Sequence, residues 1–235
     1  MNILLIGGSG HVASLITPTL KEKHTVRVFD LRPPKDETLE YTQGNVTDPE
    51  PLARAMKGID AFIYMAMGSI DWDTWQGTDS AFDANVKGLH FAMKVAADEG
   101  IKQAVYCSSM SVYADLNNRY FDDEGITPDE KELYGFTKWI GEEVCKNAYR
   151  RWGINVNALR LCHPTAKEVW LEQTRKGTPT IATTAEDVGR AMLAGLEFKA
   201  GFQTFTISGD YEHKLMNMSK AKQLLDWEPL ARPIQ

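Results

Sequence analysis

The first residues of the chain constrain its fold more than any other stretch. Asn2-Ile3-Leu4-Leu5-Ile6 is a continuous apolar run, typical of a parallel strand that is buried on both faces. A glycine turn, Gly7-Gly8-Ser9-Gly10, and a helical pattern follow it. A helix that starts at such a turn predicts an anion site, because backbone N–H groups converge there. We expect Gly7 to allow the tight turn, Gly10 to let the backbone approach a pyrophosphate, and Ala13 to permit close helix–strand packing.

An acidic residue extends this pattern towards dinucleotide binding. The next predicted strand, 25–29, ends in Asp30, 20 residues after Gly10. A carboxylate there can accept hydrogen bonds from the ribose hydroxyls of an adenosine and repel a 2′-phosphate, which favours NAD over NADP. Arg32 complicates this choice, because it can cover an adenine or bind a 2′-phosphate. The plain alternative is that Asp30 is a turn residue at a strand end.

Strand and helix patterns alternate along the rest of the chain without an internal repeat. Further strands are predicted at 39–43, 61–65, 103–107 and 154–161, and longer helices at about 80–99 and 131–151; residues 69–80 and 114–131 are predicted loops. This alternation predicts an α/β fold, a Rossmann-type doubly wound parallel sheet. We assign residues 1–161 to a dinucleotide-binding domain and 162–235 to a small substrate-binding portion interleaved with its last elements.

Composition narrows the functional classes. The balance of 26 basic and 32 acidic side chains, a net charge of −6, argues against nucleic-acid binding. No apolar run approaches the roughly 18 residues of a membrane span, and no signal-peptide pattern opens the chain, so we expect a cytoplasmic protein that does not bind membranes. Cys107, Cys145 and Cys162 lack metal-ligand spacing, and we predict reduced cysteines and no metal site.

The candidate chemistry lies on the predicted helix at 131–151. Tyr134 and Lys138 are four residues apart and would share one face, roughly 5–6 Å apart at Cβ. An ammonium beside a phenol favours the phenolate, which suits Tyr134 to acid–base work. The alternative is a core tyrosine beside a lysine that reaches solvent. Ser109, in a serine cluster at a predicted strand end, strengthens the catalytic hypothesis.

Together these motifs extend over nearly the whole chain. They comprise Gly7-x-x-Gly10-x-x-Ala13, Asp30, Gly44-Asn45-Val46-Thr47-Asp48, Asn85-Val86-x-Gly88, Ser108-Ser109-x-Ser111-Val112-Tyr113, Tyr134-x-x-x-Lys138, Ala185-Glu186-Asp187-Val188 and Leu225-Asp226-Trp227-Glu228-Pro229. On these residues the chain resembles the extended short-chain dehydrogenase/reductases, in the NAD-dependent epimerase/dehydratase branch.

The resemblance implies roles for individual residues. Tyr134 would be the general acid/base, Lys138 would lower its pKa and bind the nicotinamide ribose, and Ser109 would hydrogen-bond the substrate oxygen. Asn85 would support the active-site helix. The expected cofactor-binding residues are Gly7, Gly10, His11, Val12, Asp30, Leu31, Arg32, Asn45, Val46, Met65, Ala66, Met67, Asn85, Tyr134 and Lys138.

Three departures from the family pattern bear on the substrate. Asn45 stands where the family usually has Asp. Met110-Ser111 replaces the Asp-Glu pair of sugar-nucleotide 4,6-dehydratases, which argues against that reaction. Only about two dozen residues separate Arg160 from the helix at Asp187, a compact form similar to uronate dehydrogenases.

The short segment predicts a small substrate. Ser109, Met110, His163 and Arg175 are the candidate substrate contacts, with Arg175, Lys167 and Lys176 as candidate ligands for a carboxylate. Solvated surface cations are the alternative for these three, and packing near the nicotinamide is the main expectation for His163.

The leading hypothesis is hydride transfer between NAD and a small hydroxyl or carbonyl compound, such as a sugar or sugar acid. Two alternatives remain open at this point: a sugar or nucleotide-sugar epimerase, and a non-catalytic dinucleotide-binding protein. The resemblance also allows a homodimer.

Overall fold

The predicted N-terminal strand is an interior strand, third in the order of a seven-stranded parallel sheet. The computed structural model describes residues 1–71, 73–175 and 181–233. The strands follow the order β3-β2-β1-β4-β5-β6-β7, and every neighbouring pair is parallel. Their bounds are β1 Asn2–Ile6, β2 Thr25–Asp30, β3 Glu40–Gln43, β4 Ala61–Tyr64, β5 Gln103–Ser109, β6 Asn155–Leu161 and β7 Phe202–Ile207. The doubly wound fold is confirmed.

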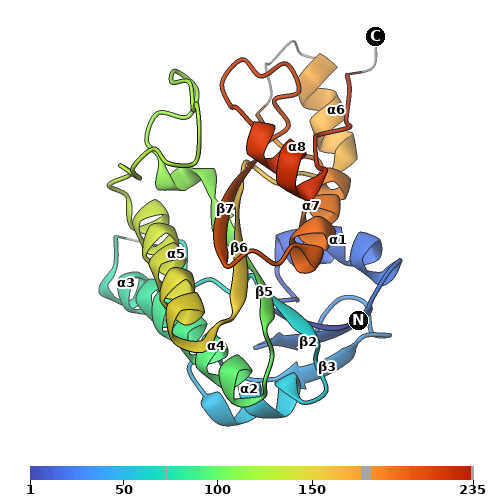
Figure 1. Cartoon of the computed structure of the whole chain (residues 1–235), viewed down its shortest axis with the longest axis vertical. Coiled ribbons are helices and arrows are strands. Elements are labelled where there is room, and N and C mark those ends of the chain that lie inside the picture. The colour runs from blue at the N-terminus through green and yellow to red at the C-terminus, as the bar shows by residue number, and fades with distance from the viewer. Residues whose placement is uncertain (72, 176–180, 234–235) are drawn as a thin grey trace.

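Helices cover both faces of this sheet (Figure 1). One face packs against α1 (His11–Lys21), α7 (Ala185–Glu197) and α8 (Ser219–Leu225); the other packs against α2 (Pro49–Met56), α4 (Leu89–Asp98) and α5 (Leu133–Trp152). Along β1, Ile3 and Leu5 face the first layer while Leu4 and Ile6 face the second. This alternation explains the continuous apolar run, since both faces of the strand are buried.

Two sequence predictions around β4 need correction. Residues 69–80 are not all loop, because helix α3 (Trp75–Phe82) begins where the Thr74 side chain accepts a hydrogen bond from Gly77 N. The helix predicted at 80–99 is also interrupted, since a π-helix, Asp83–Gly88, separates α3 from α4. Trp72 lies outside the described residues.

Strand β7 was missed by the sequence prediction. Strand β7 is the edge strand of the main sheet, and α7 and α8 pack against one face of that sheet. Much of the 162–235 portion therefore belongs to the Rossmann core. Helix α6 (Lys167–Arg175) occupies the short segment after β6. A third apolar cluster, separate from the two sheet layers, lies beyond the carboxyl ends of β5 and β6; its buried members are Met110, Val112, Tyr113, Phe121, Cys162, Ile181 and Met216.

In the described part of the chain, every helix is too short or too polar to span a bilayer.

Candidate active site

The glycine turn after β1 fits an anion. Gly7 has φ +83°, and a Cβ there would lie 2.4 Å from Ala66 N, so both the backbone angle and the space require glycine. Gly10 is the N-cap of α1, with no side-chain cap bond and no acidic residue in the first helical turn. The N-terminal N–H groups of α1 therefore face a cleft that can accept the pyrophosphate of a dinucleotide.

Asp30 is held beside this turn by backbone donors. Its Oδ2 accepts from Ser9 N at 3.0 Å and its Oδ1 accepts from Arg32 N at 3.1 Å. The Ser9 hydroxyl donates to the Arg32 carbonyl at 2.6 Å, which ties the glycine turn to the end of β2. Ser9 has no role in the sequence prediction. The cleft beside Asp30 is lined by the expected cofactor residues Gly7, Gly10, Leu31, Arg32, Asn45, Val46, Met65, Ala66 and Met67.

Asn85 connects two segments of the site through its side-chain amide. Its side chain is buried and does not line the cleft; Oδ1 accepts from Gly68 N at 3.2 Å, and Nδ2 donates to Thr137 Oγ1 at 2.9 Å. The Thr137 hydroxyl in turn donates to the Tyr134 carbonyl at 3.0 Å. Asn85 thus joins the loop after β4 to the helix that carries Tyr134.

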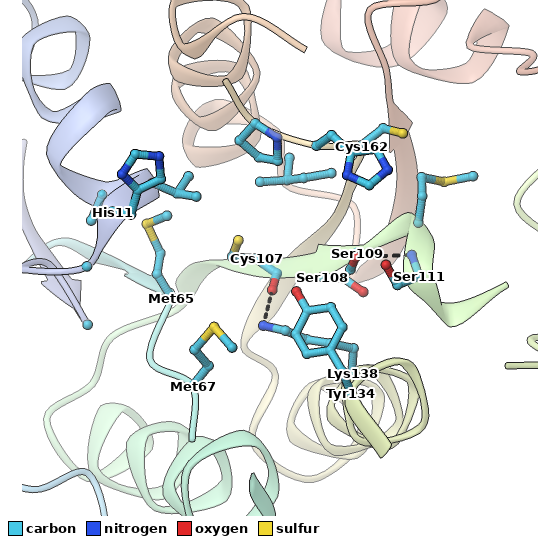
Figure 2. Close-up of a pocket in the computed structure, with 18 of the residues that line it drawn as sticks. His11, Met65, Met67, Cys107, Ser108, Ser109, Ser111, Tyr134, Lys138 and Cys162 are labelled. Carbon is cyan, nitrogen blue, oxygen red and sulfur yellow. Dashed lines mark hydrogen bonds between the residues drawn. The ribbon is translucent and has the colours of Figure 1, made fainter. Parts of the chain in front are cut away.

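Tyr134 and Lys138 reach the carboxyl end of β5 from α5, as Figure 2 shows. The Lys138 side chain is buried, and its Nζ donates to the Cys107 carbonyl at 2.8 Å. The same Nζ lies 5.8 Å from the centroid of the Tyr134 ring and 5.3 Å from that of Tyr106. The ammonium is therefore fixed between the strand and the phenol.

Ser109 completes the set at the last position of β5, and it lines the same cavity as Tyr134 and Lys138. Its Oγ accepts a hydrogen bond from Ser111 N at 3.0 Å. This bond uses an oxygen lone pair, so the hydroxyl proton remains available for a substrate oxygen. The neighbouring Ser108 points elsewhere and donates to Glu142 Oε1 at 2.6 Å, as expected from strand alternation.

The cavity lined by Ser109, Tyr134 and Lys138 is mostly apolar. The cavity volume is about 270 Å³, and its lining also includes His11 and Val12 near the glycine turn. Met110 and His163 also line it. His163 lies two residues after β6 and has φ +41°, in the left-handed region. Arg175 does not line it and is exposed at the end of α6. Lys176 lies outside the described residues.

The cysteines of the cavity are not activated nucleophiles. Burial raises the pKa of the Cys107 thiol, although the Lys138 charge acts in the opposite direction. Burial also raises the pKa of Cys162 to about 12. Both therefore stay protonated at neutral pH, when a thiolate would be needed for attack. Among the described residues, no group of three His, Cys, Asp or Glu side chains is arranged to hold a metal.

Comparison with known proteins agrees with this geometry. The NAD dependent epimerase/dehydratase family matches residues 3–204. A curated relative, the N-acetyl-alpha-D-glucosaminyl-diphospho-ditrans,octacis-undecaprenol 4-epimerase of Escherichia coli O157:H7, is 26% identical over 96% of this chain and 66% of its own length. The chain spans between 39% and 66% of the length of the first curated relatives it matches.

Two solved structures show the same fold with different ligands or substrates in their names. MoeE5 in complex with UDP-glucose and NAD superposes with a TM-score of 0.82 at 18% identity, covering 99% of this chain and 94% of its own. Glucuronic acid dehydrogenase from Chromohalobacter salexigens also gives 0.82, at 19% identity over 98% and 84%. The equal scores mean that the fold alone does not select between the substrates of these two proteins.

Proposed function

The chain belongs to the NAD dependent epimerase/dehydratase family, and from this premise we propose that it is an oxidoreductase. It transfers hydride between NAD and a small hydroxyl or carbonyl compound, such as a sugar or sugar acid. The observation that carries the proposal is one cavity lined both by the glycine turn, at Gly7 and Gly10, and by Ser109, Tyr134 and Lys138. A dinucleotide site and an acid–base set share that space, which is what hydride transfer coupled to proton transfer requires.

Each residue of the set has a role in alcohol oxidation. The Ser109 hydroxyl donates a hydrogen bond to the substrate oxygen and holds that oxygen near Tyr134. Tyr134 removes the alcohol proton as general base. Lys138, fixed by the Cys107 carbonyl, places a positive charge beside the phenol. Bound NAD supplies the hydride acceptor at the nicotinamide. In the reverse direction Tyr134 returns the proton to the carbonyl oxygen.

We assign NAD rather than NADP because of Asp30. Its carboxylate is fixed by Ser9 N and Arg32 N next to the glycine turn, where a 2′-phosphate would face an anion. Titration of the wild-type protein with both cofactors tests this, and tighter binding of NADP would overturn it. Asp30→Ala should bring the two dissociation constants closer by about tenfold, equivalent to roughly 1.4 kcal/mol.

The short segment between β6 and α7 supports a small substrate. The direct test is a screen of free sugars, sugar acids, alcohols and aldehydes for a steady change in NADH absorbance. A melting-temperature panel with NAD present complements it, because a ligand at a hundredfold its dissociation constant stabilises by about 2.7 kcal/mol. Stabilisation only by nucleotide-diphosphate sugars would overturn the small-substrate assignment.

A sugar epimerase is the second candidate. The Escherichia coli 4-epimerase that is 26% identical over 96% of this chain supports it, and the same acid–base set can serve oxidation followed by reduction. Product analysis separates the two activities. An isomerised sugar without net NADH indicates an epimerase, whereas oxidised product with equimolar NADH indicates a dehydrogenase.

A further inference from the structure

A buried ion pair lies behind the acid–base set. Arg160, on β6, binds Glu142, on α5, through two parallel contacts: Nε to Oε1 at 2.8 Å and Nη2 to Oε2 at 2.7 Å. Both side chains are only 4% exposed. Glu142 follows Tyr134 and Lys138 at successive four-residue steps, so the three side chains lie along one face of the helix.

Glu142 and Lys138 attach this helix face to the strand that carries Ser109. Lys138 Nζ donates to the Cys107 carbonyl at 2.8 Å, and one turn later Glu142 Oε1 accepts from Ser108 Oγ at 2.6 Å. The two residues directly before Ser109 are thus each bound by α5.

Two glycines of α5 allow this close seating. A Cβ at Gly135 would lie 1.8 Å from the Ser111 carbonyl oxygen, and one at Gly141 would lie 2.2 Å from the Tyr106 hydroxyl. The position of the helix on the end of β5 is therefore narrowly defined.

Arg160 also contacts the 114–131 loop, which reaches the cavity at Leu116. Its Nη1 donates to the Tyr113 hydroxyl and to the Glu124 carbonyl, the latter at 3.1 Å. Tyr113 and Glu124 bracket the part of the 114–131 loop that includes Leu116, which lines the cavity. The Glu124 carboxylate also accepts from Thr206 N at 2.9 Å, on β7.

Stability alone is a weak explanation for such a pair. Replacing a buried ion pair by apolar residues of similar volume is often neutral or stabilising, because desolvation offsets the attraction. Burial lowers the pKa of Arg160, but its hydrogen bonds to Glu142 outweigh this and raise that pKa above the ordinary value, so the guanidinium stays charged. The location of the ion pair indicates a different role. The pair contacts Ser108, which precedes Ser109, and the 114–131 loop, and Glu142 lies on the helix that carries Tyr134.

We propose that Glu142 and Arg160 are positioning residues, which set the distance between the Tyr134 hydroxyl and Ser109. They also couple that distance to the position of the 114–131 loop. This inference rests on the proposed oxidoreductase function. Neither residue lines the cavity, and both side chains are buried. Their effect should therefore appear in kcat and not in cofactor affinity.

The decisive variant replaces both charges, Glu142→Leu with Arg160→Met. We expect a melting temperature close to that of the wild type, an NAD dissociation constant within threefold, and a kcat at least tenfold lower. Glu142→Gln should lower kcat as well, and Glu143→Gln is the matched control, because Glu143 is exposed on the same helix and pairs with Lys146 at the surface. A double variant that folds and keeps kcat within twofold of the wild type would overturn the proposal.

Hydrogen exchange gives a readout that does not depend on turnover. In Glu142→Gln, exchange should rise in residues 108–131 and stay unchanged in residues 3–13. If the double variant does not fold, Ser108→Ala takes its place, with the same expected change in exchange. Unchanged exchange in residues 108–131 would overturn the positioning role. Absence of wild-type turnover with every substrate would instead count against the proposed function, so the two failures are distinguishable.

Discussion

The two halves of the cleft are built in different ways. The cofactor half is formed by the ends of β1, β2 and β4. Its defining features are the backbone turn at Gly7 and Gly10 and the Asp30 carboxylate, which accepts hydrogen bonds from backbone N–H groups. The substrate half depends on side chains from segments far apart in sequence, which meet in the separate apolar cluster that joins Met110 and Cys162 to Met216.

This difference separates what each half tolerates. A site built from backbone groups loses affinity when an added Cβ clashes with it or strains its conformation. A site built from packed side chains is destabilised when a cavity or a charge is introduced. Tyr134 and Lys138 stand at the junction, so they report on both halves at once.

The largest effect is expected from Tyr134→Phe at that junction. It removes the proton-transfer group but keeps the ring, so kcat should fall by about a thousandfold while NAD affinity stays within threefold. Steady-state kinetics and a binding titration check this. Tyr149→Phe is the control, since Tyr149 is an exposed tyrosine of the same helix; near wild-type turnover in Tyr134→Phe would contradict the catalytic assignment.

Gly7→Ala should break the cofactor half selectively. The new Cβ would meet the Ala66 backbone, in addition to the strain of φ +83°, so NAD affinity should fall more than tenfold and stability by about 1–3 kcal/mol. Gly153→Ala is the matched control, because Gly153 has φ +66° but a Cβ added there would meet no atom within 4 Å. It should lose stability only. Equal NAD affinity in the two variants would contradict the assignment of the Gly7 turn to cofactor binding.

Alkaline pH should destabilise the substrate half. Burial raises the pKa of Cys162 to about 12, and burial raises that of Tyr113 to about 12 against the opposing charge of Arg160. The unfolded chain releases these protons at lower pH, near 8.5 and 10, so it binds fewer protons than the folded chain and stability falls above about pH 9.

For Cys162 the loss should reach about 2–3 kcal/mol at pH 11. Urea unfolding at pH 8 and pH 11 measures it. Cys162→Ala should be less stable at pH 8 but lose less between the two values; an equal loss in both proteins would contradict the assignment.

The smallest effects compare two candidate substrate contacts. His163→Ala should raise KM by about tenfold, the scale of one lost hydrogen bond to substrate. Arg175→Ala should change KM less than twofold, because Arg175 is exposed and does not line the cavity. Initial-rate kinetics with the best substrate of the screen provide the measurement. A large effect at Arg175 alone would restore it as a carboxylate ligand.

The local features of the sequence determined the fold class and most of the cofactor half. Apolar runs, the glycine turn and Asp30 act over short stretches, and parallel strands place their carboxyl ends at one edge by geometry. The first six strands and the helix of Tyr134 and Lys138 were predicted for this reason. The spacing of Tyr134 and Lys138 also contained a signal for Glu142, four residues later, which the prediction did not use.

Tertiary structure decided what depends on contacts between distant residues. One partner of Asn85 is Thr137, 52 residues away, and the partners of Arg160 are Glu142, Tyr113 and Glu124. The exclusion of Arg175 from the cavity is likewise a matter of where α6 packs. Side-chain periodicity gives the buried face of an element but not its neighbour, because many pairings bury the same apolar area and only the packed whole selects one.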